Sequence, residues 1–353
     1  MYQDQRIAVV IPARDEAPRI GAVLRTVPAW VDHVIVVDDG STDGTAAEVR
    51  AATGRDARVS LEVHAASRGV GAALATGYRA ALALDCDVAA VMAGDGQMDP
   101  ADLQAVVHPV ATDQCDYCKG NRFLPAGALP RIPAVRRYGS FLLTALTKVA
   151  SGYYHVSDPQ CGFTAMGRDA LEAVGVAGFY PRYGYPNDLL ARLNVAEMRV
   201  AEVPVRPLYD VGERSQMRLR RVTFTILGVL VAAFFRRLWR KHVLASGHPV
   251  VFAYGASLLA AVGTTGLGVY LAVQYARTGW IMKAALIVAC ALGALSVQLL
   301  MTALGMDHEA SRHLAVHLRR APMRRRVAVP APAANEDAEA PARVRRGPGA
   351  PEK

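Results

Sequence analysis

Residues 7–16 read Ile-Ala-Val-Val-Ile-Pro-Ala-Arg-Asp-Glu, and residues 34–45 read Val-Ile-Val-Val-Asp-Asp-Gly-Ser-Thr-Asp-Gly-Thr. In each stretch, a short apolar run that is typical of a buried strand is followed at once by a polar cluster. The same pattern returns at 88–99, where Val-Ala-Ala-Val-Met precedes Ala-Gly-Asp-Gly-Gln-Met-Asp. These three units decide how the N-terminal region is interpreted.

Amphipathic or Ala-rich segments separate the apolar runs, at 19–27, 45–52 and 69–84, and a further apolar run lies at 59–63. Strands that alternate with helices of this length indicate βαβ units and a mostly parallel sheet. Such sheets bind ligands at the carboxyl ends of their strands, where all three polar clusters fall. We therefore predict a Rossmann-like α/β fold with a nucleotide-binding edge.

Three apolar stretches follow, and they explain why 52% of the residues are hydrophobic, a high share for a soluble enzyme. The first, 222–235, is short for a bilayer and runs into the basic segment 236–241, a pattern typical of an interfacial helix. The runs 249–273 and 280–306 carry almost no charge and are long enough to span a membrane. Their glycines would allow close helix contact and so permit a homo-oligomer.

The placement of charge restricts the partners and the topology. The formal net charge is +9, and much of the excess lies in Arg-rich segments beside the apolar runs, which favours lipid headgroups over nucleic acid. The predicted loop 274–279 carries one Arg, whereas the other flanks are dense in Arg and Lys. The positive-inside rule then places the α/β domain and both termini in the cytoplasm, and we expect no signal peptide.

Four regions follow from these patterns. They are an α/β domain at 1–221, an amphipathic interfacial helix at 222–246, a two-helix transmembrane hairpin at 247–306, and a basic tail at 307–353. The end of the tail is rich in Pro, Ala and charge, which predicts cytoplasmic disorder.

The first two polar clusters carry a resemblance to a known family. Residues 11–16 followed by 38–45 are similar to the opening of family 2 glycosyltransferases of the GT-A fold, in which these loops hold the nucleotide. Asp15 stands where the family usually has Asn. The resemblance implies nucleotide-binding roles for Pro12, Arg14, Glu16, Asp38, Asp39, Gly40, Ser41 and Gly94.

The third cluster is the candidate metal site. In this family the place carries an Asp-x-Asp motif, and here Ala93 occupies the position of the first Asp and Asp95 that of the second. A cation that bridges two phosphates needs hard oxygen ligands, so we expect Mg²⁺ or Mn²⁺ with Asp95, Gln97 and Asp99 as candidate ligands. The alternative is that Asp95 and Asp99 only shape a turn before Pro100.

Downstream motifs supply the remaining candidates. Residues 119–123 match the family's segment after the fifth strand, and 158–164 are similar to its acceptor loop, with Cys161 and Thr164 replacing the usual Ser and Arg. Residues 185–190 align with a segment that directs an acidic side chain into the site. The resemblance implies catalytic roles for Asp95, Asp158 and Asp188, although a helix cap or ion pair is an equal alternative for Asp158 and Asp188.

A basic segment follows the last apolar run of the domain, at 200–205. Arginine binds phosphate through two parallel hydrogen bonds and stays charged, so such a segment suits a diphosphate or a lipid phosphate. The resemblance implies phosphate or acceptor binding by Arg122, Arg206, Arg214, Ser215 and Arg218. A basic face that only meets solvent or headgroups is the alternative.

Taken over residues 6–221, the motifs are most similar to polyprenyl-phosphate sugar synthases, typified by dolichyl-phosphate mannose synthase and undecaprenyl-phosphate glucosyltransferase. The resemblance implies transfer of a hexose from a nucleotide diphosphate-sugar, of UDP-glucose or GDP-mannose type, to a polyprenyl phosphate at the cytoplasmic membrane face. We expect one in-line displacement with inversion. A processive polysaccharide or glycolipid synthase of the same superfamily and an inactive scaffold that binds a nucleotide-sugar remain alternatives.

Overall fold

The computed structural model describes residues 1–124, 134–206 and 219–318, with side chains left out of the description at 134–140 and 219–224. The predicted phosphate-binding residues Arg214, Ser215 and Arg218 lie outside the described residues. Most of the predicted tail, from 319 onward, also lies outside them.

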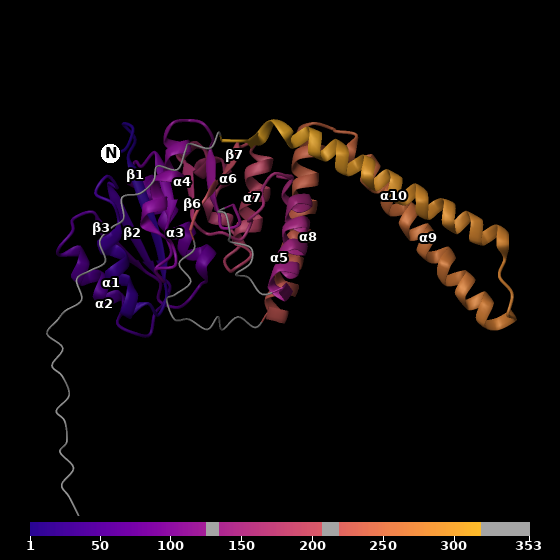
Figure 1. The fold of residues 1–353 in the computed structure, drawn as a ribbon, viewed down its shortest axis with the longest axis horizontal. Helices are drawn as coiled ribbons and strands as arrows, with labels where there is room; N and C mark the ends of the chain where they lie inside the picture. Colours follow the sequence, from indigo (N-terminus) through magenta and orange to yellow (C-terminus); the bar gives the residue numbers. More distant parts are fainter. Residues whose placement is uncertain (125–133, 207–218, 319–353) are drawn as a thin grey trace, which may run out of the picture. The chain divides into compact units, whose positions relative to one another are not determined.

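An eight-stranded sheet forms the centre of the α/β region within the described part of the chain (Figure 1). Its order is β3-β2-β1-β4-β6-β5-β7-β8, and β6 alone runs antiparallel to its neighbours. The mostly parallel sheet of the prediction is therefore confirmed. The strands are β1 (Ile7–Ala13), β2 (His33–Asp38), β3 (Val59–Val63), β4 (Val88–Val91), β5 (Tyr117–Asn121), β6 (Thr164–Gly167), β7 (Val200–Pro204) and β8 (Ala315–Val316).

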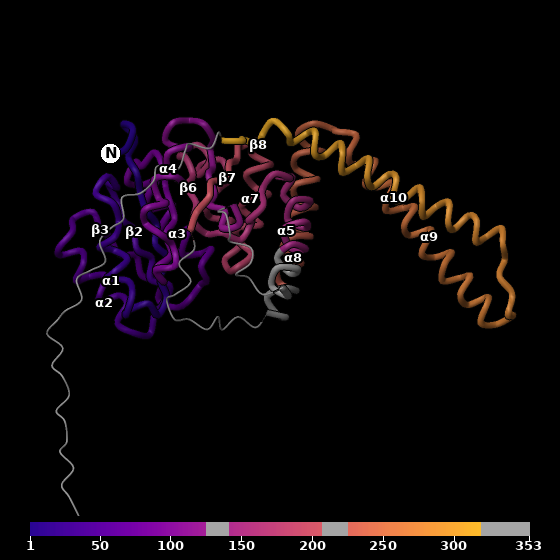
Figure 2. The backbone as a smooth tube through the Cα atoms, viewed as in Figure 1, coloured from indigo at the N-terminus to yellow at the C-terminus, as the bar shows by residue number. Residues whose placement is uncertain are grey.

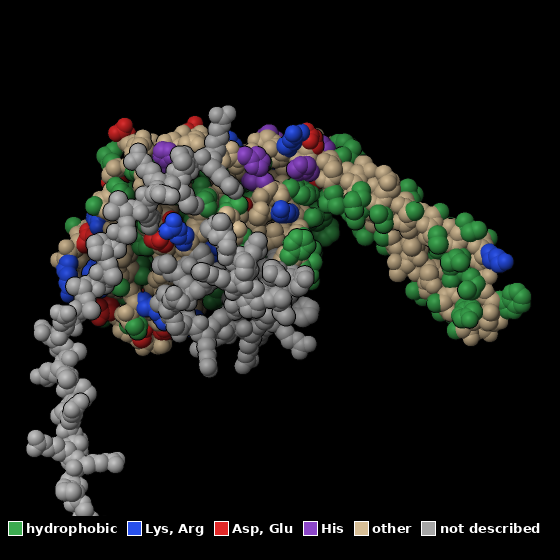
Figure 3. Space-filling view, in the orientation of Figure 1, with side chains coloured by type: hydrophobic (Ala, Val, Ile, Leu, Met, Phe, Trp, Pro, Cys, Tyr) green, Lys and Arg blue, Asp and Glu red, His purple; other side chains and the backbone are tan. Residues whose placement is uncertain are grey.

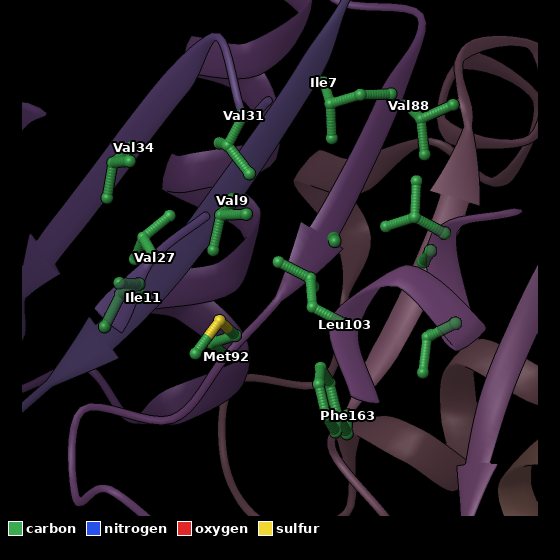
Figure 4. Close-up of a cluster of buried hydrophobic side chains, with 14 of the residues drawn as sticks. Ile7, Val9, Ile11, Val27, Val31, Val34, Val88, Met92, Leu103 and Phe163 are labelled. Carbon is green, nitrogen blue, oxygen red and sulfur yellow. The ribbon is translucent and has the colours of Figure 1, made fainter. Parts of the chain in front are cut away.

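Helices cover both faces of this sheet because successive side chains of a buried strand point to opposite faces. Ile7, Val9 and Ile11 of β1 pack with one set of helices (Figure 4). Ala8 and Val10 pack with the other. The first set is α1 (Ala17–Thr26), α2 (Thr45–Thr53) and α4 (Leu103–Ala111); the second is α3 (Val70–Ala83), α6 (Arg168–Val174) and α7 (Tyr185–Val195). Short 3-10 turns lie at η1 (Pro100–Asp102), η3 (Val176–Gly178) and η5 (Arg312–Leu314).

Two further helices, α5 (Ala134–Ser151) and α8 (Leu219–Arg237), pack against each other and against α7. Ala150 of α5 and Ile226 of α8 are buried between them. Both helices also expose large apolar side chains, such as Phe141 on α5 and Phe235 on α8, which are 74% and 59% exposed. The predicted interfacial segment thus lies in α8 and in the π-helix η4 (Leu238–Ala245) that continues it, while α5 was not predicted.

The helices α9 (Val250–Thr278) and α10 (Lys283–Ser311) form a hairpin (Figure 2). Each has 29 residues, and both are long and apolar enough to cross a membrane. Reciprocal hydrogen bonds of 2.9 and 3.0 Å join Ser257 and Ser296, and apolar side chains cover much of the exposed surface (Figure 3). The predicted loop 274–279 is mostly the last turn of α9, which ends at Gly279 in the left-handed conformation.

A hairpin-base cluster joins the hairpin to the α/β domain. Its centre is the fully buried pair Arg237–Asp307, in which two guanidinium nitrogens donate to the two carboxylate oxygens, each at 2.7 Å. Asp307 also accepts from the Tyr154 hydroxyl at 3.2 Å, and its Oδ1 lies 3.2 Å from His242 Nε2. Tyr254 of α9 is within 3.5 Å of the same carboxylate.

The chain beyond α10 returns to the sheet. Residues Ala315 and Val316 of β8 pair in parallel with Val200 and Ala201 of β7, and Leu314 is buried in the core. The predicted tail boundary at 307 therefore falls inside ordered structure, because Asp307 is buried and the segment after α10 completes the sheet. Both ends of the hairpin contact the α/β domain.

Candidate active site

The parallel strands end at one edge of the sheet, which we call the catalytic edge. The register pairs Ala13 at the end of β1 with Asp38 at the end of β2. It also pairs Val91 of β4 with Thr164, the first residue of the antiparallel β6. The loops after β1, β2, β4, β5 and β7 and the segment before β6 must therefore meet there. Sequence spacing predicted this arrangement for the first, second and fourth strands.

The loops after β1 and β2 hold each other. Asp15 donates its backbone N–H to Ser41 Oγ at 3.0 Å, and Thr42 N donates to the Asp15 carboxylate at 2.8 Å. Asp38 accepts from Ser41 N at 2.9 Å and from the Ser41 hydroxyl. Gly40 has φ +68°, and a Cβ there would lie 2.6 Å from the backbone nitrogen of Ser67, so this turn requires glycine.

Asp39 is buried and fixes the loop that leads into α3. Its carboxylate accepts from Ser67 Oγ, Arg68 N and Gly69 N, each at 2.8 Å, and lies 2.7 Å from His64 Nδ1. Burial acts to raise the pKa of Asp39, but these hydrogen bonds outweigh it and hold the pKa below its usual value. The side chain thus stays charged and shapes the floor of the candidate nucleotide site.

The other nucleotide candidates lie around this floor. Arg14 is exposed and donates to Ser67 Oγ at 2.9 Å, while Glu16 pairs with Arg19 at 2.8 Å. Gly94 lies against β1, since a Cβ there would approach Ala13 Cβ to 3.2 Å and the carbonyl oxygen of Pro12 to 3.3 Å. All eight predicted nucleotide-binding residues therefore lie at the ends of β1 and β2 or on the loops after β1, β2 and β4.

The candidate metal loop is a tight turn after β4. Gln97 N donates to Asp95 Oδ1 at 2.9 Å, and Gly96 has φ +74°. Asp99 Oδ1 accepts from Ala101 N at 2.9 Å and so caps η1. Among the described residues, no three His, Cys, Asp or Glu side chains gather as a preformed metal site.

The segment before β6 reaches this loop and the start of α7. A Cβ on Gly162 would lie 3.5 Å from Met98 Cε and 3.3 Å from the Tyr185 hydroxyl. Within the segment, Asp158 is buried and forms a two-pronged ion pair with Arg122, with Nε–Oδ2 2.8 Å and Nη2–Oδ1 2.9 Å. Burial acts to raise the pKa of Asp158, but the hydrogen bonds and charge of the Arg122 guanidinium outweigh this effect, and the pKa lies below its usual value.

Asp188 faces α8. Its carboxylate accepts from Tyr180 N at 3.1 Å and Arg192 Nε at 2.8 Å, and it also pairs with Arg236 of α8. Asp188 and Arg236 line a pocket of about 290 Å³ between α8 and the first turn of α7. Among the described residues, the ion pairs of Asp188 are with Arg192 and Arg236, so the ion-pair alternative weighed for Asp188 is observed.

Arg206 follows β7 at the catalytic edge. Its backbone N–H donates to Asp102 Oδ2 at 2.7 Å, which links it to the turn after the Asp95 loop, and its side chain is exposed. Two charged side chains to which the sequence analysis gave no role lie in the strands behind this edge, Lys119 within β5 and Glu202 within β7. Glu202 lies inside the apolar run predicted at 200–205, where a charged residue is a signal for a buried partner.

The model of glycosyl transferase family 2 matches residues 8–175, which include β1, β2, β4 and the segment before β6. The chain belongs to this family. It is 27% identical over 251 residues to a UDP-N-acetylglucosamine–dolichyl-phosphate N-acetylglucosaminyltransferase of Methanococcus voltae, covering 67% of this chain and 97% of the relative. It is 29% identical over 205 residues to an undecaprenyl-phosphate mannosyltransferase of Micrococcus luteus, covering 57% and 82%.

Among solved structures, glucosyl-3-phosphoglycerate synthase from Mycobacterium tuberculosis in complex with Mn²⁺, UDP and glucosyl-3-phosphoglycerate aligns with a TM-score of 0.49 and 22% identity. The alignment covers 65% of this chain and 80% of that one. Another structure of that enzyme holds Mg²⁺ and UDP.

Proposed function

We propose that this glycosyltransferase moves a hexose from a nucleotide diphosphate-sugar, of UDP-glucose or GDP-mannose type, to a polyprenyl phosphate at the cytoplasmic face of a membrane, with inversion. The observation that carries the proposal is the meeting of the β1, β2 and β4 loops with the segment before β6, in a chain that also holds an apolar hairpin. The two relatives named for polyprenyl-phosphate acceptors support the acceptor class.

The nucleotide occupies the floor formed by the loops after β1 and β2. The buried Asp39 network keeps these loops in place without a ligand, which lowers the entropic cost of binding. The guanidinium of Arg14, whose side chain is 58% exposed, borders the floor beside the Asp15 carboxylate, 3.7 Å away, and can approach an anionic group from solvent. Gly94 lets the backbone after β4 approach closely.

A divalent cation, Mg²⁺ or Mn²⁺, fits this edge as a bridging ion. Mg²⁺ commonly takes one or two carboxylates and completes its shell with water and substrate phosphates. Asp95 supplies such a carboxylate, and Gln97 lies in the same turn, whereas Asp99 is engaged as a cap. When bound, the ion would neutralise charge that develops on the leaving diphosphate.

The acceptor phosphate attacks the anomeric carbon directly. Its second pKa is about 6, so much of it is dianionic at neutral pH and needs no strong general base. Arg206 and the predicted residues Arg214, Ser215 and Arg218 would hold that phosphate. In this scheme, the buried ion pair of Asp158 with Arg122 holds the segment before β6 in place.

Membrane attachment brings the edge to its acceptor. The polyprenyl chain lies in the bilayer and its phosphate emerges at headgroup level, so tethering raises the effective concentration of the two partners. The exposed apolar side chains of α5 and α8 suit the interface. Both hairpin ends contact the α/β domain, which favours two crossings with the Arg-rich flanks in the cytoplasm.

The test is transfer of label from a panel of nucleotide-sugars to a short polyprenyl phosphate by the purified full chain, with and without Mg²⁺. We expect a lipid-linked product of inverted anomeric configuration. Asp95→Asn should lower kcat by at least about 100-fold, because it removes charge at the site of leaving-group stabilisation. Asp85→Asn, at an exposed position beyond α3, is the matched control.

Each alternative predicts a different product. A long polymer would indicate a processive synthase, and label on diacylglycerol would indicate a glycolipid synthase. Donor binding without any transfer would support the scaffold, and a retained anomeric configuration would exclude the direct displacement. Full activity of Asp95→Asn would remove Asp95 from the metal site.

A further inference from the structure

Lys119 is a buried cation in the middle of β5. Its side chain is 0% exposed, and its ammonium donates to the carbonyl oxygen of Cys161. No carboxylate of the described residues forms an ion pair with it, and burial lowers the pKa of Lys119. An apolar side chain at this strand position would avoid the desolvation cost of an ammonium.

Glu202 of β7 supplies a carboxylate near this buried cation. Its carboxylate accepts from the backbone N–H of Ser157 and of Asp158 at 3.0 Å, and from Asn121 Nδ2 at 2.8 Å. Burial raises the pKa of Glu202 despite these hydrogen bonds. Glu202 thus holds the first residues of the segment before β6, and Lys119 holds a later one.

Together with Arg122 and Asp158, these residues form an edge cluster of two cations and two carboxylates. Its members come from β5, the residue after it, β7 and the segment 157–162, and the Arg122–Asp158 pair fixes the start of that segment. Each of the four charges therefore acts on the same short stretch. That stretch is the one whose Gly162 lies against Met98 of the Asp95 loop.

We propose that Lys119 and Glu202 are positioning residues that hold segment 157–162 against the Asp95 loop in the geometry that sugar transfer requires. This inference rests on the proposed function. A displacement of a reacting partner by about 1 Å can cost about 100-fold in rate, so a loop held at three points by buried charge has a kinetic consequence. The hydrogen bonds of Asp39 in the donor floor go to other residues than those of Lys119 and Glu202 within the described part of the chain, so donor binding should not depend on the latter two.

The decisive variant is Lys119→Met, which keeps the length of the side chain and removes the charge. Met fills the space without an ammonium that must be desolvated, so we expect the variant to fold, and Tm is measured beside kcat to show that it does. The carbonyl of Cys161 loses its donor, and we expect kcat to fall by about 10-fold or more. The KM for the donor should change less than about 2-fold.

Glu202→Gln provides a second measurement if Lys119→Met does not fold. Its amide keeps one acceptor oxygen but cannot accept from both sides, so kcat should fall while donor affinity is kept. Glu202→Asp, which retains the carboxylate, should recover part of the loss. Glu172→Gln on α6 is the matched control, because Glu172 is exposed and pairs only with Arg168 among the described residues.

The outcomes separate the inference from the function on which it rests. Absence of sugar transfer by the wild-type chain would overturn the proposed function. Transfer by the wild type with unchanged kcat in Lys119→Met, or in Glu202→Gln where the first variant does not fold, would overturn the positioning role alone. A fall in kcat that is matched by loss of donor affinity would also overturn it, because the defect would then be general.

Discussion

Two clusters of buried charge in this protein differ in how their cations are neutralised. In the hairpin-base cluster, Arg237 is paired directly with Asp307 and also donates to backbone carbonyls of Val149 and Ala150. In the edge cluster, Arg122 pairs directly with Asp158, but the fully buried Lys119 donates to a carbonyl and is balanced by carboxylates beyond ion-pair distance. Direct pairing secures contact between helices, whereas an indirectly balanced cation weakens the fold and is retained for what it positions. Substitutions should therefore change stability first at the hairpin base and turnover first at the edge.

The largest stability effect should come from Asp307→Asn. The substitution leaves Arg237 buried with no carboxylate, and breaking a buried pair in this way costs about 3–5 kcal/mol. Unfolding of the purified chain in detergent measures the loss as a lower Tm. The double variant Arg237→Met with Asp307→Leu should recover most of it, because no charge remains to be desolvated. Unchanged Tm in Asp307→Asn would erase the contrast between the clusters.

The next largest effect is a change of about 3 kcal/mol in the free energy of unfolding with pH, which we expect from His155. This residue follows α5 and contacts β7. His155 Nε2 lies 2.9 Å from the carbonyl oxygen of Val200, and burial lowers its pKa to about 4. The unfolded chain binds a proton near pH 6.5 and the folded chain does not. Stability is therefore constant above about pH 6.5 and falls as the pH drops toward 4, by about 3 kcal/mol in total.

The measurement is Tm against pH from 7.5 to 4 for the wild type and for His155→Gln, which keeps a hydrogen-bond donor and does not titrate. The variant should show a shallower fall. The carboxylates Asp39 and Asp158 have lowered pKa values, so their contributions are lost below this window and do not obscure it. Equal slopes for both proteins would contradict the assignment to His155.

A smaller effect is expected from Gly152→Ala. Gly152 has φ +79°, and a Cβ there would lie 2.9 Å from both Arg237 Nη1 and Asn194 Nδ2. We expect a loss of about 1–3 kcal/mol from the strained backbone and the crowded guanidinium. Gly175→Ala shares a positive φ but has open space around the added Cβ, so it reports the backbone contribution alone. A loss no larger than that of Gly175→Ala would mean that Arg237 tolerates the crowding.

The sequence predicts most of this fold because the strands are continuous apolar runs. The run 59–63 coincides with β3, the run 7–11 stops two residues before the end of β1, and the run 34–37 is one residue shorter than β2 at each end. By contrast, β6 reads Thr-Ala-Met-Gly and β8 has two residues, so neither carries a periodic signal. Both depend on pairing with strands that are distant in the chain, which local pattern does not encode.

In the candidate site, too, some features follow from local sequence pattern and others depend on contacts between distant parts of the chain. The carboxyl ends of parallel strands share an edge, so the placement of Asp39 and Asp95 on adjoining loops follows from the order of elements. The partners of Asp188 do not follow from that order, because Arg236 lies 48 positions away on a helix outside the sheet. Likewise, the local sequence does not predict that Lys119 and Glu202 lie close together, because this depends on the pairing of β5 with β7.

The return of the chain to β8 has a consequence for biosynthesis. β8 is the last strand in sequence and covers the edge of β7, but it emerges from the ribosome only after both apolar helices have been made. Until then β7 presents an unpaired edge, of the kind that invites aggregation. Closure of the sheet therefore waits for synthesis of the hairpin, and a nascent chain that stalls before Leu314 exposes an incomplete core.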